Sequence, residues 1–471
     1  MNSQDAFLKQ SKTIEKYQKA EPELLQHPSR RSENEVFQEI GIKNIPEKRQ
    51  EAYIRLFPQD FIVEEVSRDG TIVPIKESKV EEGEKSNTLY VKLLKIGIPT
   101  NVAIQRIAEK LGINYGKIGF SGLKDAGAIT TQALAFPNLE LQPDDLYKLN
   151  DEVANVYLSS AYYGSGSLNA GDLYGNKFTL TIRTNGSIND AIIQTRAKTI
   201  SMHGILNYFH TQRFGGLRLL SHKLGMLLLR GEHETLIRYF LFKKVTDDIT
   251  LIANIRSRAE KHYPDWTKIK EVFEELPYSF YNEIRLLTSL EEDKDNYVKA
   301  LTAIQDQTQL WAYAYASWLF NEYISDYAMS RGLVDEEFPL LLSDRPQDFK
   351  IYKKFLKRDN TESFIKHLRP FKFIPLKKRT LAGRVVPHDI NFRNFAGGVV
   401  MQFTLPKGAY ATTFLINLFE LYQGLPIPEW VSTEEIDPLR LYNNNNMEWI
   451  KERFSEYNFG FKADIVKSAT T

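Results

Sequence analysis

KIGFSGLKDAGAITTQALAF (residues 117–136) is the stretch on which the predicted fold is centred. Its two halves, 117–123 and 128–136, are rich in apolar and β-branched residues and predict two β-strands. The short loop Lys124-Asp125-Ala126-Gly127 joins them. An aspartate in such a loop can form a turn, pair with a cation or act as a catalyst, and a turn is the commonest role before Ala-Gly. Residue types and spacing leave these roles open for Asp125.

Further strand patterns precede and follow this stretch. Alternating or short apolar runs occupy residues 51–57, 61–66, 89–96, 156–164, 176–183 and 397–405. A helix is predicted from Thr100, as its cap, to Leu111, because apolar residues recur there at helical spacing and Gly112 follows. Two more helices are expected over 188–208 and 410–423.

Residues 217–374 differ in character, because long aromatic and apolar stretches such as 310–329 predict helices and strand patterns are scarce. A mixed segment, a helical block and a second mixed segment indicate one domain inserted into another. The expected boundaries are a charged N-terminal arm (1–48), a main domain in two segments (49–216 and 375–425), an inserted domain (217–374) and a C-terminal tail (426–471).

Both ends of the chain are predicted to lie outside the cores. Residues 1–50 hold 17 charged residues without a sustained apolar period, so we expect an exposed arm with one helix over about 5–19. The run Asn443–Asn446 and the charged tail after it have the composition of a protein surface.

The composition excludes several classes of protein. The 471 residues include no cysteine, which excludes disulfides, thiol nucleophiles, iron–sulfur clusters and cysteine-based zinc sites. No run approaches the roughly 18 apolar residues of a membrane helix, and the polar N-terminus lacks the pattern of a secretory signal. We therefore expect a cytoplasmic protein with no membrane partner.

Sequence motifs for cofactor chemistry are also missing. GSGSLNAG (164–171) has the wrong glycine spacing for a dinucleotide loop, and no GxxxxGK[ST] or HExxH motif occurs. We expect no metal and no cofactor.

Charge is unevenly distributed, although 61 basic and 60 acidic residues give a net charge of only +1. Residues 191–231 and 363–388 contain no acid, and basic and aromatic residues are interleaved in both. Cations bind phosphates and aromatic rings stack on unpaired bases, so the two segments predict a basic groove for RNA.

Five ordered blocks resemble those of the TruD family of tRNA pseudouridine synthases. GFSGLKDAGAITTQ (119–132) is similar to the family motif that carries the catalytic aspartate. The other four blocks are FPQDFIVEE (57–65), GDLYGNKFTLTIR (171–183), NYFHTQRFG (207–215) and LPKGAYATTFL (405–415). The resemblance covers about residues 50–425 and implies an α+β fold, with a mixed, largely antiparallel sheet and an inserted, mostly helical domain.

The resemblance implies an isomerase that detaches uracil from its sugar, rotates it and rejoins it through C5, without cofactor. Asp125 would be the nucleophile that attacks the ribose or the base. The uridine must first be flipped out of its stack. The groups implied to bind the substrate are Phe61, Asn207, Phe209, Tyr410, Arg55 and Lys124. Each aromatic could instead be core, and Asn207 could be a helix-end cap.

The chain departs from the family pattern beside the aspartate. Ala126-Gly127 follows Asp125 where the family usually has a basic residue, His210 replaces a glycine, and Ala409 replaces a serine. The expected substrate is a uridine in tRNA, at position 13 in the D-arm, and the expected enzyme is a monomer. Another tRNA position or mRNA remains an alternative target.

Two rival functions use the same residues. A non-catalytic RNA chaperone of this family would use the same groove, and Ala126-Gly127 favours it. A glycosidase would need a second carboxylic acid near Asp125, for which Glu64 and Glu65 are the candidates.

Overall fold

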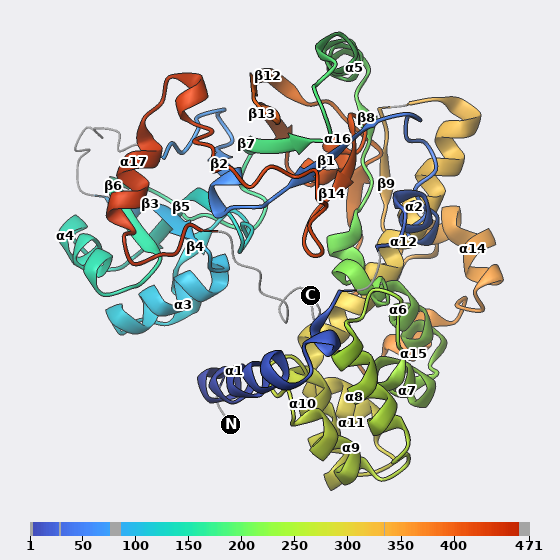
Figure 1. Ribbon diagram of the computed structural model, residues 1–471. Coiled ribbons are helices and arrows are strands. Elements are labelled where there is room, and N and C mark those ends of the chain that lie inside the picture. Colours follow the sequence, from blue (N-terminus) through green and yellow to red (C-terminus); the bar gives the residue numbers. More distant parts are fainter. Residues whose placement is uncertain (1–2, 28–29, 76–85, 334, 461–471) are drawn as a thin grey trace. The chain divides into compact units, whose positions relative to one another are not determined.

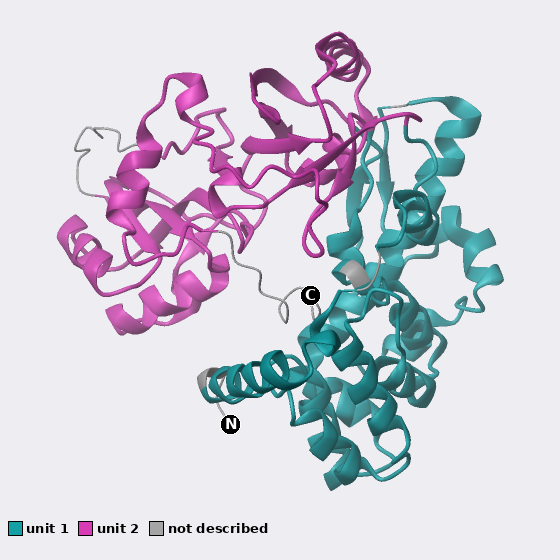
Figure 2. Cartoon of the chain, in the orientation of Figure 1, with its two compact units in different colours: residues 1–45, 206–384, 463–471 teal, residues 46–205, 385–462 magenta. Residues whose placement is uncertain are grey.

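The computed structural model describes residues 3–27, 30–75, 86–333 and 335–460 (Figure 1). The chain forms two compact units, coloured separately in Figure 2. Residues 46–205 and 385–462 form the first, here named the sheet unit, and residues 1–45, 206–384 and 463–471 form the second, named the helical unit. The predicted functional domains and their boundaries stay a prediction.

A mixed sheet of ten strands, among the described residues, is the framework of the sheet unit. The strands are β1 (Gln50–Ile54), β2 (Phe61–Val66), β3 (Thr88–Ile96), β4 (Gly119–Phe120), β5 (Ile129–Pro137), β6 (Val156–Gly164), β7 (Gly175–Thr184), β12 (His388–Phe395), β13 (Gly398–Pro406) and β14 (Phe419–Tyr422). The main order is β12-β13-β7-β2-β5-β3-β6, with β1 joined to β7 and β14, and β4 joined to β5. Most pairs are antiparallel, whereas β2 with β5 and β1 with β14 are parallel. The expected α+β class with a mixed sheet is confirmed.

Helices cover both faces of the sheet around β3 and β5. The helix α3 (Thr100–Leu111) packs in one apolar cluster with Leu93 of β3. On the opposite face, α17 (Asn446–Arg453) packs in another cluster with Leu94. Successive side chains of a strand point to opposite faces, so these neighbouring leucines enter different cores.

The expectation that the C-terminal segment lies on the surface is wrong for one face of α17. Met447 and Ile450 of α17 are 1% and 0% exposed and pack with Ile62 and Ile129. The apolar residues of this segment are few but recur at helical spacing, and one buried face of a short helix needs no more. This helix supports the two parallel strands, β2 and β5, that both begin at the predicted site.

Two predicted helices are shorter than expected. The helix α5 (Asp190–His203) ends at Gly204, and the strand β8 (Ile205–Leu206) follows. The helix α16 (Ala411–Leu415) gives way to β14, which pairs in parallel with β1. Pairing with the open edge of β1 outweighs the local helical pattern, as tertiary contacts commonly do.

The strand predicted over 117–123 is confined to Gly119 and Phe120, which pair with Leu134 and Ala135. The connection to β5 is therefore residues 121–128, twice as long as the predicted loop. Side chains rather than a strand ladder satisfy its main chain, as described for the candidate site.

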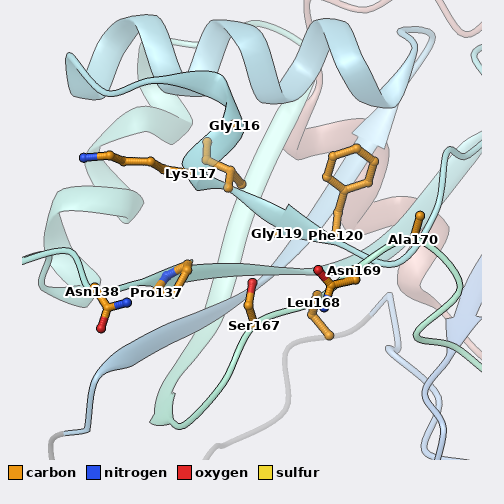
Figure 3. Close-up of a pocket in the computed structure, with 11 residues that line it drawn as sticks. Gly116, Lys117, Gly119, Phe120, Pro137, Asn138, Ser167, Leu168, Asn169 and Ala170 are labelled. Atoms are coloured by element: carbon orange, nitrogen blue, oxygen red, sulfur yellow. The ribbon is translucent and has the colours of Figure 1, made fainter.

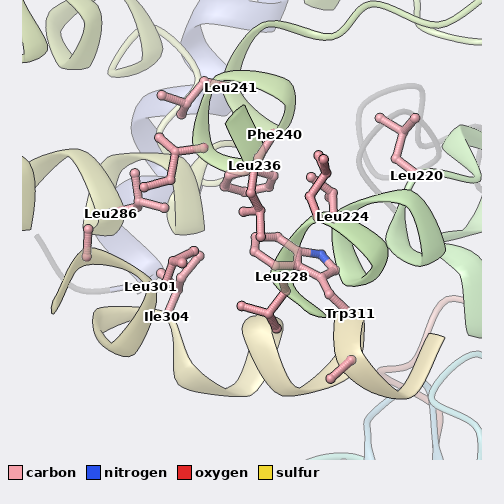
Figure 4. Close-up of a cluster of buried hydrophobic side chains, with 14 of the residues drawn as sticks. Leu220, Leu224, Leu228, Leu236, Phe240, Leu241, Leu286, Leu301, Ile304 and Trp311 are labelled. Atoms are coloured by element: carbon pink, nitrogen blue, oxygen red, sulfur yellow. The ribbon is translucent and has the colours of Figure 1, made fainter. Parts of the chain in front are cut away.

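Helices build the helical unit around one apolar core. Those of seven or more residues are α1 (Ser3–Ala20), α2 (Glu33–Glu39), α6 (Ser221–Arg230), α7 (His233–Phe242), α8 (Thr250–Glu260), α9 (Trp266–Phe273), α10 (Tyr281–Glu292), α11 (Tyr297–Ala303) and α12 (Gln305–Arg331). Leu228 of α6, Phe240 of α7 and Trp311 of α12 meet in this core (Figure 4). Gly225 lets α6 approach α12 closely, because a Cβ there would overlap the carbonyl of Trp311. None of the described helices is both long and apolar enough to cross a membrane.

The N-terminal arm is helical as expected, over Ser3–Ala20, but its predicted exposure is wrong. Ile14 and Leu25 are 8% and 4% exposed and belong to the core of the helical unit. The Tyr17 hydroxyl donates a hydrogen bond to Glu275. The arm buries one narrow apolar face of its helix. Charged residues are so numerous in the arm that its overall composition gives no sign of this face.

The packing of α17 generates a stability prediction. Ile450→Ala removes a fully buried side chain from the cluster with Ile62 and Ile129, and we expect a loss of about 2–5 kcal/mol in the free energy of unfolding. Urea denaturation followed by tryptophan fluorescence measures the change. Glu448→Ala on the exposed face of α17 is the control and should stay within about 0.5 kcal/mol of the wild type. Equal stability of both variants would mean that α17 does not hold the sheet.

Candidate active site

Asp125 lies on the loop of residues 121–128, between β4 and β5 of the sheet unit. Lys95 of β3 fixes the main chain there, because its Nζ donates a hydrogen bond to the Asp125 carbonyl oxygen at 2.7 Å. Lys95 is fully buried, and burial lowers the pKa of its ammonium to about 8 against the opposing effect of the Asp125 charge. One buried cation therefore anchors the loop beneath the carboxylate.

Two uncharged side chains fix the loop just before Asp125. Thr100 Oγ1 accepts a hydrogen bond from the Lys124 amide at 2.9 Å and donates one to Gln132 Oε1 at 2.9 Å. Gln132 Nε2 donates to the Gly122 carbonyl at 3.2 Å. The expectation that Thr100 caps its helix is wrong: it is the first residue of α3 after the N-cap Pro99, and its hydroxyl binds the loop.

Lys124 ties the loop to β2. Its Nζ lies 2.6 Å from Glu65 Oε2, and the two side chains are only 3% and 2% exposed. Glu65 Oε1 also accepts a hydrogen bond from the Ala133 amide at 3.2 Å. Removing one partner of a buried pair leaves an uncompensated charge, at a cost of about 3–5 kcal/mol. The Lys124 ammonium is thus directed into the protein and not toward solvent.

The Asp125 carboxylate itself remains accessible, with 26% of its side chain exposed. Its Oδ2 accepts a hydrogen bond from Arg55 Nη2 at 2.5 Å, and its Oδ1 accepts one from the Gly127 amide at 3.1 Å. The Arg55 guanidinium also lies over the Phe61 ring, with its Cζ 3.8 Å from the ring centroid. Arg55, Phe61 and Asp125, all predicted from the sequence, are thus in contact in one unit.

The pKa of Asp125 lies below its ordinary value. Burial acts to raise this pKa, but the charge and hydrogen bond of Arg55, the Gly127 amide and the charge of Lys95 together outweigh burial. The carboxylate is therefore ionised at neutral pH, which is the state that a carboxylate nucleophile requires.

The β1–β2 connection holds Arg55 and Phe61 in place. Arg55 adopts φ of 63°, in the left-handed region that non-glycine residues rarely occupy and that clusters at functional sites. Asp60, immediately before Phe61, is fully buried and pairs with the equally buried Arg183 of β7 at 2.5 Å. Its Oδ2 also accepts a hydrogen bond from the Phe57 amide at 2.9 Å. The connection is thus anchored between Arg55 and Phe61, through Asp60.

Tyr410 lies in the same unit as Asp125. It is the N-cap residue of α16 and is half-buried. Ala411, the next residue, packs in one apolar cluster with Phe61 and with Ala128 at the end of the loop. The start of α16 therefore shares a core with the elements that carry Arg55 and Asp125.

Asn207 and Phe209 lie in the helical unit, directly after β8. Asn207 is 1% exposed; its Nδ2 donates a hydrogen bond to the Ala382 carbonyl at 3.0 Å, whereas its buried Oδ1 has no hydrogen-bond partner among the described residues. Phe209 packs edge-on against Phe320, with ring centroids 5.7 Å apart. The Asn207 side chain thus has an unused hydrogen-bond acceptor, and the Phe209 side chain is part of a buried core.

The basic segments are partly neutralised by acids distant in sequence. Arg218 Nε lies 2.9 Å from Asp248 Oδ1, and Lys223 Nζ lies 2.5 Å from Glu39 Oε1. The absence of acids within residues 191–231 therefore does not leave these cations unpaired. In the second segment, six cations are exposed on the helical unit: Lys366, Arg369, Lys372, Lys377, Lys378 and Arg379.

The two candidate second acids of a glycosidase are bound to lysines. Glu65 pairs with Lys124, and Glu64 Oε2 lies 3.4 Å from Lys177 Nζ. A glycosidase general acid must carry a proton, whereas a neighbouring cation stabilises the ionised form. The pairing weighs against that rival function.

A hollow of about 550 Å³ opens beside β4 (Figure 3). It is lined by Gly116–Phe120 and by Pro137, Asn138, Ser167, Leu168, Asn169 and Ala170. None of the predicted site residues lines it. Within the described part of the chain, no group of three or more His, Asp or Glu side chains is arranged to hold a metal ion.

Lys95, Glu65 and Thr100 hold the loop although the catalytic motif does not include them. Lys95 and Glu65 are charged residues within strands, and such residues ordinarily face solvent. Their burial becomes evident only when β2, β3 and β5 are placed side by side. Gln132, in contrast, lies inside the motif 119–132, and its position there was a signal that could have identified it.

A family model described as tRNA pseudouridine synthase D (TruD) matches residues 46–339. Among curated proteins, the "Probable tRNA pseudouridine synthase D 1" of Methanocaldococcus jannaschii is 26% identical over 385 aligned residues, and the alignment covers 78% of this chain and 95% of that protein. The "Probable tRNA pseudouridine synthase D" of Thermococcus sibiricus is 27% identical over 421 residues, covering 78% of this chain and 94% of the relative.

The fold is also similar to a crystal structure. That structure, of a putative tRNA pseudouridine synthase D from Methanosarcina mazei, has a TM-score of 0.59 and 20% identity, covering 86% of this chain and 99% of its own. At this identity the similarity supports the fold alone. The family match spans more than half of the chain and begins at residue 46, where the sheet unit begins. The chain therefore belongs to the TruD family of tRNA pseudouridine synthases, which are isomerases.

Proposed function

We propose that this protein isomerises a uridine in tRNA to pseudouridine, with Asp125 as the nucleophile. The observation that carries this proposal is the state of that carboxylate: 26% exposed, bound to Arg55 at 2.5 Å and placed on a loop anchored by buried side chains. A nucleophile needs an ionised, accessible and fixed group, and these contacts supply all three.

The reaction requires the carboxylate to bond covalently to the ribose or the base. The bond between uracil N1 and ribose C1′ then breaks, the uracil rotates, and its C5 forms a new bond to C1′. The bond to the Asp125 carboxylate breaks as well, which restores the free enzyme. The proton on C5 is lost to solvent, and N1 gains one, so the product is an isomer of the substrate. No oxidant, reductant or nucleotide takes part.

The base has to be extruded from its stack before Asp125 can reach it. The Arg55 guanidinium covers the Phe61 ring, and Phe61 is only 3% exposed. An extruded base can stack on the guanidinium plane itself, as bases do on arginine, or on Phe61 once Arg55 has moved. In the first arrangement Arg55 contacts both the base and the nucleophile.

Asn207 has the hydrogen-bonding state that a uracil reader needs. Its Nδ2 is already bound to the Ala382 carbonyl, which leaves Oδ1 as an acceptor. Uracil presents a donor at N3, whereas cytosine presents an acceptor there, so this amide favours uracil. Phe209 and Tyr410 are proposed as aromatic contacts of the substrate, and the exposed cations of residues 363–388 as phosphate contacts.

The finer assignments belong to the proposal as well. They are a target at position 13 in the D-arm, a monomeric enzyme and a cytoplasmic location. The rival is an RNA-binding member without activity, which Ala126-Gly127 favours because a basic residue is missing beside the nucleophile.

Asp125→Asn tests the nucleophile directly. With tRNA that carries tritium at C5 of uridine, the wild type should release label, and the variant should release at least 1,000-fold less, because an amide cannot form the covalent bond. RNA retention on filters should fall less than threefold, because the residue keeps its shape.

Asp69→Asn, an exposed aspartate of the same unit, is the matched control and should release label at the wild-type rate. Tritium release by Asp125→Asn would rule out the proposed nucleophile. RNA binding without release by the wild type, on every transcript tried, would favour the non-catalytic rival.

Arg55→Met tests the electrostatic role of the ion pair through pH. Arg55 keeps the pKa of Asp125 low, so its removal raises that pKa and protonates the nucleophile at a higher pH. We expect the acidic limb of the kcat profile to move upward by about one to three pH units, from below the ordinary range of an aspartate in the wild type. Arg68→Met, which breaks an ion pair with Asp172 in the same unit, should leave the limb in place. An unshifted limb in Arg55→Met would contradict this role.

A further inference from the structure

Leu123 is the most exposed large apolar side chain in the described part of the sheet unit. It is 70% exposed and precedes Asp125 by two residues. A single exposed leucine ordinarily needs no explanation. Here, however, the nearby loop residues Ser121 and Lys124 are only 2% and 8% exposed. The loop is therefore packed against the protein, while the side chain of Leu123 points to solvent.

The main chain on either side of Leu123 is fixed. The Gly122 carbonyl accepts a hydrogen bond from Gln132, and the Lys124 amide donates one to Thr100. Lys124 is held further by its buried pair with Glu65. A side chain on a backbone that is already ordered loses only its own rotamer freedom when it binds, which makes the exposed leucine a preorganised contact.

The space around the leucine is open. No heavy atom lies within 4 Å of the position that a Cβ would take at Gly122, and at Gly127 only the Asp125 carboxylate comes within that distance. Two glycines flanking the Leu123–Asp125 segment thus leave room for another molecule to approach the loop closely. Ala126-Gly127, in place of the larger basic residue usual in the family, adds to this room.

Resting on the proposed function, we propose that Leu123 is the wedge that enters the base stack of the tRNA when the target uridine is extruded toward Asp125. Extrusion breaks stacking on both sides of the uridine, and apolar side chains are the groups that proteins insert between unstacked bases. Two residues of chain span at most about 7 Å, and stacked bases follow every 3.4 Å, so Leu123 reaches the position next to the nucleotide bound by Asp125.

The test compares Leu123→Ala with wild type on two substrates. The first is the intact tRNA, and the second is the same tRNA with an abasic nucleotide directly 3′ of the uridine that sequencing shows the wild type to modify. In the second substrate one stacking contact of the uridine is already lost, so extrusion depends less on an inserted side chain. Leu123→Met keeps an apolar side chain of similar length, and Met329→Ala removes an equally exposed apolar side chain from the helical unit as a control.

We expect Leu123→Ala to lower kcat at least tenfold on intact tRNA and less than threefold on the abasic tRNA, with less than a threefold change in Kd on either. Leu123→Met and Met329→Ala should stay within threefold of wild type. Full activity of Leu123→Ala on intact tRNA would overturn the proposed wedge and leave the proposed function in place. Equal losses of kcat on both substrates would also overturn the wedge, because they indicate a structural role of Leu123. A wild type that modifies no uridine would overturn the proposed function and the wedge with it.

Discussion

The ion pair between Arg55 and Asp125 joins the two connections that form the candidate site. Arg55 belongs to the β1–β2 connection and Asp125 to the β4–β5 loop, and the guanidinium lies between the Phe61 ring and the carboxylate. The pair keeps the aspartate ionised despite its burial. It also places an aromatic ring beside the nucleophile, so charge, orientation and a stacking surface all depend on one arginine. The buried Asp60–Arg183 pair holds that connection against the sheet.

The anchors of the loop act on its main chain and leave the carboxylate free to react. Lys95 binds the Asp125 carbonyl, Thr100 binds the Lys124 amide, and Gln132 binds the Gly122 carbonyl. Because these bonds do not involve the reactive oxygens, the loop is preorganised before any substrate binds, and little reorganisation is needed during the reaction. The same anchors hold Leu123 outward, so the nucleophile and the proposed wedge share one rigid support.

Strand patterns and family blocks predicted β2, β3, β5 and β7 closely, because a short apolar run bounded by turn residues is a local property of the sequence. The structure brings Arg55, Phe61 and Asp125 into contact, and the roles predicted for them in catalysis and substrate binding stay predictions. What failed depends on contacts between distant segments. β14 forms because it pairs with the free edge of β1, and α17 is buried because it packs on one face of the sheet. Glu39 neutralises Lys223 although 184 residues separate them. The roles of Lys95 and Thr100 could not be predicted for the same reason.

A crystal structure of the Asp125→Asn variant bound to its tRNA tests the central claim most directly. The account predicts one uridine extruded from its stack, with the carbon that is attacked (C1′ of the ribose or C6 of the base) within about 3.5 Å of the residue-125 side chain and with Arg55 against the base. A uridine that stays stacked, or one that is bound in the hollow beside β4 instead, would contradict the assignment of Asp125 as the nucleophile.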